Sequence, residues 1–169
     1  MKKHFTLAAC LLVLFTGTTF AQKKFRIGLG VEGALPLTGL SNVYSFGAGA
    51  TARFAYNVND KMGITFTSGA IAFIPKGMAK AANLKAQINI PIKGGFRYMI
   101  TDKFYGIAEA GVTMAKSYAV VGTQSVSATA STFTYAPGVG IMLGGFDFSL
   151  RYEGYQGAGF AGFRAGFNF

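Results

Sequence analysis

The chain has 169 residues, of which 51% are hydrophobic and only 13% are charged, with a formal net charge of +10. This length predicts a single domain, and the charged fraction lies well below the ~25% typical of soluble domains, which argues against an ordinary soluble protein. After the first twenty residues, no apolar run approaches the ~18 residues that a membrane-spanning helix needs. Backbone groups in lipid must be hydrogen-bonded within the protein, so a closed β-barrel is the remaining membrane-spanning fold.

Residues 1–21 have the pattern of a cleaved signal peptide. A basic start at Lys2 and Lys3 precedes an apolar run over residues 7–15, and a small-residue cleavage site ends at Ala21. A retained anchor helix is the alternative, but the apolar run is too short for one. The only cysteine and the only histidine of the chain fall within this segment. The mature chain, residues 22–169, would therefore contain neither.

From Gln22 onward, apolar residues alternate with small or polar ones in eight segments, which is the period-two pattern of strands with two different faces. We expect strands at residues 25–35, 44–57, 62–73, 86–98, 104–116, 133–143, 146–155 and 160–169. In the third segment the alternation shifts near Ser68 and Gly69, which predicts a β-bulge at that point.

The connections alternate between short and long. Short turns are expected at residues 58–61, 100–103 and 144–145, and longer connections at residues 36–43, 74–85, 117–132 and 154–159. This is the pattern of an all-β, eight-stranded antiparallel up-and-down transmembrane β-barrel with its long loops outside the cell. Residues 117–132 alternate weakly, so they form either an exposed strand edge that could pair with a partner or a flexible polar loop.

The placement of charge predicts which face meets lipid. A soluble eight-stranded barrel such as a lipocalin would turn its apolar face inward. Here the apolar face carries no ions within the strands, which suits a lipid-facing exterior. The small-residue face would then line the lumen and hold an ion network, in which we expect Lys93 to pair with Glu109. The predicted network consists of Arg26, Glu32, Arg53, Lys93, Arg97, Glu109, Asp147, Arg151, Glu153 and Arg164.

The eight tyrosines lie near the ends of the predicted strands, five toward the long connections and three toward the short turns. The first group is Tyr44, Tyr118, Tyr135, Tyr152 and Tyr155, and the second is Tyr56, Tyr98 and Tyr105. Amphipathic rings gather at the two surfaces of a membrane, so we expect two tyrosine belts on the exterior.

Enzymatic activity is not expected, because the mature chain lacks the histidine or cysteine on which acid–base and nucleophilic catalysis commonly rely. The same lack argues against a metal site, and the Gly-x-Gly pairs lie inside strands rather than in a cofactor-binding loop. No cofactor and no nucleic-acid partner are therefore predicted. Four lysines flank the long connections and would either contact lipopolysaccharide phosphates or simply be solvated: Lys76, Lys80, Lys85 and Lys116.

The chain closes on Phe167-Asn168-Phe169. Together with the signal peptide and the eight segments, this ending resembles the small bacterial outer membrane protein β-barrel domain family, which includes OmpX, OmpW and the OmpA barrel. The resemblance implies a location in the Gram-negative outer membrane, and implies that Phe167 and Phe169 form the signal read by the barrel assembly machinery. It favours a structural or adhesion-like surface protein with a plugged lumen and a possible extracellular partner. A narrow channel or transporter for small or hydrophobic solutes is the alternative.

Overall fold

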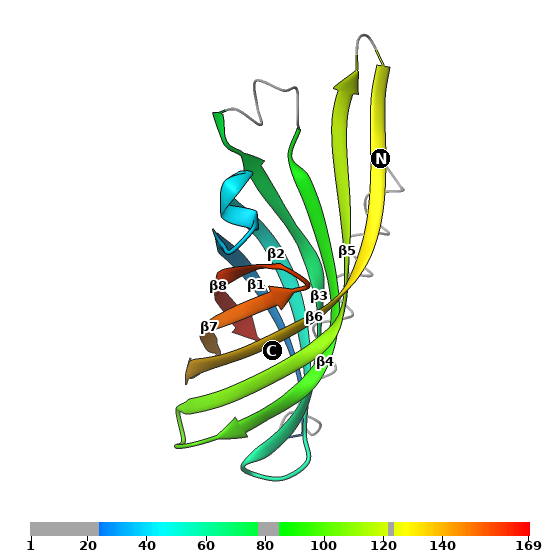
Figure 1. Ribbon diagram of the computed structural model, residues 1–169. Helices are drawn as coiled ribbons and strands as arrows, with labels where there is room; N and C mark the ends of the chain where they lie inside the picture. The colour runs from blue at the N-terminus through cyan, green and yellow to red at the C-terminus, as the bar shows by residue number, and fades with distance from the viewer. Residues whose placement is uncertain (1–23, 78–84, 122–123) are drawn as a thin grey trace, which may run out of the picture.

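The computed structural model describes residues 24–77, 85–121 and 124–169 (Figure 1). The strands pair in chain order, all antiparallel, and β8 pairs with β1 to close the barrel. The predicted eight-stranded up-and-down barrel is therefore confirmed, whereas the predicted signal peptide lies outside the described residues. The strands are β1 (Phe25–Leu37), β2 (Tyr44–Asn57), β3 (Met62–Pro75), β4 (Gln87–Met99), β5 (Phe104–Val121), β6 (Gln124–Leu143), β7 (Phe146–Tyr155) and β8 (Ala158–Asn168).

The three short turns lie where the sequence predicts them, and they define the turn end of the barrel. The opposite, loop end carries the remaining connections, the first of which contains the 3-10 helix η1 (Leu40–Asn42). The expected long connection at 154–159 is wrong, because β7 and β8 are joined by residues 156 and 157 alone. Gly157 has a φ of 76° in this turn, a conformation that glycine adopts without a Cβ clash.

Strands β5 and β6 extend well beyond their neighbours. They include most of residues 117–132, for which the sequence was compatible with either strand or loop. They pair with each other as far as Val121 and Gln124, whereas β4 pairs with β5 only to Lys116 and β7 pairs with β6 only from Tyr135. Residues 117–121 thus pair with residues 124–128 alone, and the edge of β6 that faces β7 stays unpaired as far as residue 134. Residues 117–121 and 124–134 are here called the β5–β6 ribbon, which rises above the rest of the barrel (Figure 1).

The exterior of the barrel is apolar and the interior is charged. Phe96, Phe133 and Val31 expose more than 60% of their surface, and other large apolar side chains on the same face are exposed as well. Nine of the ten predicted luminal ions are buried instead, and Arg26 is half-buried. The predicted orientation of the two faces is confirmed. Within the described ranges, no helix has the length and apolar character needed to cross a membrane.

The β-bulge predicted at Ser68 and Gly69 is absent. Strand β3 pairs with β2 in one continuous register from Ile74 to Gly63, and the only irregularity in this pairing lies beside Tyr44. The alternation of apolar residues changes in the sequence because Ile71 and Phe73 point into the lumen, where both are fully buried. The lumen itself is apolar at this height.

These two side chains belong to an apolar cluster at the loop end of the lumen, here called the apolar cap. Its buried members are Ala34, Tyr44, Ile71, Phe73 and Phe160, and residues from η1 and its flank pack against them. The rings of Phe73 and Phe160 meet edge to face with centroids 5.3 Å apart. An apolar cluster therefore lies inside the barrel on the loop side of the ions.

The expectation of two exterior tyrosine belts is wrong for three of the eight residues. Tyr44 lies in the apolar cap, Tyr105 is buried in the lumen, and the hydroxyl of Tyr155 donates to Glu153. Four tyrosines are exposed on the outer face of their strands: Tyr56, Tyr98, Tyr135 and Tyr152.

Candidate functional site in the barrel lumen

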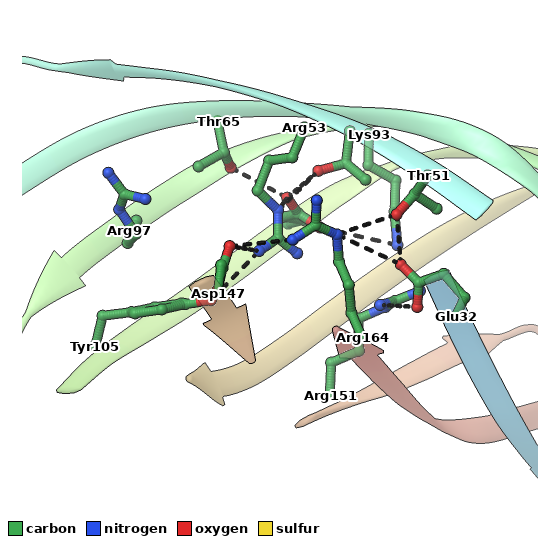
Figure 2. A network of polar contacts seen from close by, with 12 residues as sticks. Glu32, Thr51, Arg53, Thr65, Lys93, Arg97, Tyr105, Asp147, Arg151 and Arg164 are labelled. Carbon is green, nitrogen blue, oxygen red and sulfur yellow. Dashed lines mark hydrogen bonds and ion pairs between the residues drawn. The ribbon is translucent and has the colours of Figure 1, made fainter. Parts of the chain in front are cut away.

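Eight buried ions from six strands form the centre of the lumen, and Figure 2 labels six of them. Each occupies an inward position of a period-two strand, and glycines at other inward positions leave room for the long side chains to cross the barrel. Four are cations and four are carboxylates. They are Glu32 on β1, Arg53 on β2, Lys93 on β4, Glu109 on β5, Asp147, Arg151 and Glu153 on β7, and Arg164 on β8.

One half of this arrangement centres on Arg151. Its Nη1 lies 2.8 Å from Oε2 of Glu32, and its Nε lies 3.1 Å from Oε2 of Glu153. The same Glu153 oxygen is 2.5 Å from Nζ of Lys93. Strands β4 and β7 are not neighbours in the sheet, so the Lys93–Glu153 contact crosses the lumen.

The other half returns to Glu32. Lys93 Nζ is 3.8 Å from Glu109, which lies 3.7 Å from Arg53 Nε. Arg53 and Arg164 both reach Oδ2 of Asp147, at 3.4 and 3.1 Å. Arg164 Nε then lies 3.9 Å from Glu32, which closes the circuit. Every member has two partners of opposite sign, and we call this neutral circuit the ion ring.

Hydroxyl groups complete the coordination of the carboxylates. Thr51 donates to Glu32 at 2.7 Å, and Thr67 donates to Glu109 at 2.7 Å. The hydroxyl of Tyr105 donates to Oδ1 of Asp147 at 2.5 Å. Buried carboxylates need such donors, because an unpaired charge out of water is costly.

Tyr105 is the functional neighbour that sequence reasoning missed. Tyr105 and Glu109 are four residues apart on β5, so their side chains point to the same side of the strand. This spacing predicts an inward position for Tyr105, although the residue also lies close to a turn. Gly140 lies opposite it on β6, and a Cβ at Gly140 would come within 2.3 Å of the tyrosine ring. A glycine is therefore needed there for Tyr105 to reach Asp147.

Two of the ten predicted network residues lie outside the ion ring. Arg97 donates to Oδ1 of Asn57 at 2.8 Å, and Arg26 Nη1 lies 3.5 Å from the sulfur of Met142. Neither guanidinium has an Asp or Glu side chain within ion-pairing distance among the residues that the structure describes. Both face the turn end of the lumen.

The remaining predicted residues lie on the outside or at the loop end. Phe167 and Phe169 are exposed on the exterior, and Phe167 packs edge to face against Phe146 with centroids 5.3 Å apart. Lys76 donates from Nζ to the carbonyl of Ser41 at 2.6 Å. Lys85 and Lys116 are exposed, while Lys80 lies outside the described residues.

The charges of the ion ring are paired with one another. Each carboxylate is engaged by two cations, and the described residues contain no group of three or more side chains of the metal-ligating types. Buried ion pairs add little net stability over a hydrophobic filling, but breaking one leaves an uncompensated charge at a cost of roughly 3–5 kcal/mol. Each member of the ion ring therefore depends on its neighbours for charge compensation.

No protein-family model and no curated protein matches this sequence. Solved structures do match it. The attachment invasion locus protein Ail of Yersinia pestis has a TM-score of 0.64 at 14% identity, with 86% of this chain and 98% of Ail covered. The N-terminal β-barrel domain of Pseudomonas aeruginosa OprF has a TM-score of 0.63 at 11% identity, covering 85% and 97%. Neisserial surface protein A has a TM-score of 0.53 at 11% identity, covering 85% and 95%.

At these identities the likeness concerns the fold. The chain has the architecture of the small outer-membrane β-barrels, as its resemblance to the OmpX and OmpA barrels implies. This fold and the apolar exterior together indicate the outer membrane as its location.

Proposed function

We propose that this protein is a non-catalytic outer-membrane barrel that acts at the cell surface, presenting the β5–β6 ribbon to an extracellular partner above a closed lumen. In barrels of this kind the short turns face the periplasm, so the loop end and the ribbon face outward. The observation that carries the proposal is the ribbon, a two-stranded edge held clear of the barrel.

The ribbon has the properties of a pairing surface. On the β6 side, residues 124–134 contain neither a charge nor a proline, the usual devices that protect an edge strand. On the β5 side, the support described beyond Lys116 consists of two bonds, from the hydroxyl of Ser117 to Gln87 and from the amide of Lys85 to the carbonyl of Tyr118. An extended segment of a partner could add to such an edge through main-chain hydrogen bonds.

Two stacked obstructions support the proposal of a closed lumen. The ion ring joins strands across the barrel, and its members are at most 4% exposed. The apolar cap lies between the ion ring and the loop end. An eight-stranded barrel leaves an interior just wide enough for side chains, so we propose that no open path for solute remains.

Lysines at the loop end add a second kind of contact. We propose that four lysines contact phosphates of lipopolysaccharide: Lys76, Lys80 and Lys85 from the connection between β3 and β4, and Lys116 from β5. A structure of Ail was determined with the heparin analogue sucrose octasulfate, which is a precedent for a polyanion on a barrel of this fold. Phe167 and Phe169 are proposed to serve the barrel assembly machinery during insertion.

The test of the surface role shortens the ribbon and leaves the barrel intact. Replacing residues 118–127 by Asn-Gly would join Ser117 to Ala128, which already face each other, through a two-residue turn that suits a hairpin. Cells displaying the full chain or the shortened chain at equal level are then compared for adhesion to surfaces coated with matrix protein or sulfated glycan. Adhesion that falls to background with the shortened chain supports the proposal, and equal adhesion contradicts it.

The alternative function, a narrow channel or transporter, is tested by ion conductance of the refolded chain in planar bilayers. A folded barrel should be silent. Defined and reproducible channel steps would contradict the closed lumen and would identify Arg53, Lys93 and Glu109 as pore-lining residues.

A further inference from the structure

The turn end of the lumen opens into a cavity of about 1210 Å³, here called the vestibule. The three short turns and the ends of their strands form its wall. Five basic and two acidic side chains line it. Because the ion ring is neutral within itself, it does not offset this excess of positive charge.

Arg97 lies in the wall of the vestibule and is only 4% exposed. Its guanidinium donates to Asn57 and lies 5.7 Å from the centre of the Tyr105 ring. Figure 2 shows it apart from the ion ring, with no dashed line to any residue drawn. All four cations of the ion ring have two carboxylate partners, whereas Arg97 has none among the described residues.

Arg26 approaches the same point from β1. Its Nη1 lies 3.5 Å from the sulfur of Met142, and Nη1 of Arg97 lies 3.9 Å from that same atom. A thioether is a weak acceptor and carries no charge to offset two guanidiniums. Two like charges that converge on one uncharged atom beside an open cavity form a receptor for an anion.

The rim of the vestibule would guide an anion to this point. Lys24, Lys61 and Lys103 line the rim and are exposed. Asp60 and Asp102 precede two of these lysines in the turns and offset part of their charge. The deeper arginines have no such offset, so the attraction is strongest within the cavity, where the surrounding protein focuses the field.

We propose that the vestibule binds a phosphate-bearing molecule, with Arg26 and Arg97 donating to the phosphate oxygens. One guanidinium fork occupies both oxygens of a carboxylate, whereas a terminal phosphate has three oxygens and can receive two forks from different directions. The cavity also exceeds the volume of a bare phosphate and leaves room for the group that carries it. In the proposed orientation the vestibule faces the periplasm. The phosphate then comes either from an inner-leaflet lipid or from a soluble periplasmic compound.

The experiment is an NMR titration of the refolded barrel in uncharged maltoside micelles. The probes are inorganic phosphate, dihexanoyl phosphatidic acid and a hexose 6-phosphate. The readouts are the Nε–Hε resonances of the arginines and the amide of Gly63 in the vestibule wall. Saturable shifts confined to Arg26, Arg97 and their surroundings are expected. Tighter saturation by the short-chain lipid assigns the lipid source, and tighter saturation by the sugar phosphate assigns the soluble source.

Arg97→Gln and Arg26→Gln are each expected to weaken phosphate binding by about tenfold or more, as the loss of a charged hydrogen-bond pair implies. Thr38→Glu is the matched control, because it makes the same change in net charge on an exposed residue at the loop end. Arg97→Lys keeps the charge but loses the fork. It should also bind more weakly, and it serves if Arg97→Gln does not refold. Heat-modifiable mobility verifies folding of each variant.

Three results would overturn the proposal. Shifts that do not saturate would exclude a site, and equal shifts with chloride would show an adventitious ion only. Phosphate affinity that falls as much in Thr38→Glu as in Arg97→Gln would show general electrostatic attraction instead of binding in the vestibule.

Discussion

Neutralising one carboxylate of the ion ring should destabilise the whole barrel, and Glu109→Gln makes this change with the smallest disturbance of shape. Glutamine keeps an oxygen that can accept from Thr67, so the hydroxyl contact at 2.7 Å survives while the charge is lost. The ion ring would then hold four cations against three carboxylates.

The expected loss in the free energy of unfolding depends on the ion pairs that Arg53 and Lys93 keep. Arg53 loses a contact of 3.7 Å and keeps Asp147 at 3.4 Å, and Lys93 loses a contact of 3.8 Å and keeps Glu153 at 2.5 Å. Both lost contacts are the longer of the two that each cation makes. The cost should therefore lie at the lower end of the range for breaking a buried pair, about 3 kcal/mol.

A second variant separates the ion ring from other effects. Glu109→Gln combined with Lys93→Met removes one ion of each sign and restores neutrality. The double variant should be more stable than the sum of the single losses predicts, by roughly 1–3 kcal/mol. Urea unfolding from lipid vesicles, followed by far-ultraviolet circular dichroism because the chain has no tryptophan, measures each free energy. Unchanged unfolding in Glu109→Gln, or strictly additive losses in the double variant, would refute the reasoning.

Two further predictions use the same unfolding assay. Phe73→Ala removes a fully buried ring from the apolar cap and should cost about 3–5 kcal/mol, whereas Phe66→Ala, on the lipid-facing side of the same strand, should cost clearly less; equal losses would mean that the apolar cap is not a packed core. Gly140→Ala places a Cβ against the ring of Tyr105 and should cost about 1–3 kcal/mol, while Gly106→Ala, where a Cβ meets nothing within 4 Å, serves as its control. A Gly140→Ala barrel as stable as its control would show that Tyr105 has room to move.

Period-two alternation identified the strands because it is a local property. Strands β2 and β7 match their expected bounds, and the three short turns fall at the predicted residues. The outward and inward faces also follow from sequence, since ions are confined to one parity and lipid tolerates none. The tip of the ribbon could not be decided in this way, because a weakly alternating polar segment is compatible with both strand and loop until its partner strand is known.

Sequence by itself thus determined the barrel, its strand number, which face of each strand points outward, and the burial of nine of the ten predicted ions. Only the tertiary structure decided which ions meet, because closure brings together residues as distant in sequence as Arg53 and Asp147. It also placed Phe73 and Tyr105 inside. The lumen changes from charged to apolar along the barrel axis, so the sequence alone does not show whether an apolar side chain in a strand points into the lumen or toward lipid. The two arginines left outside the ion ring became visible for the same reason, because charge balance is a property of the closed lumen and not of any one strand.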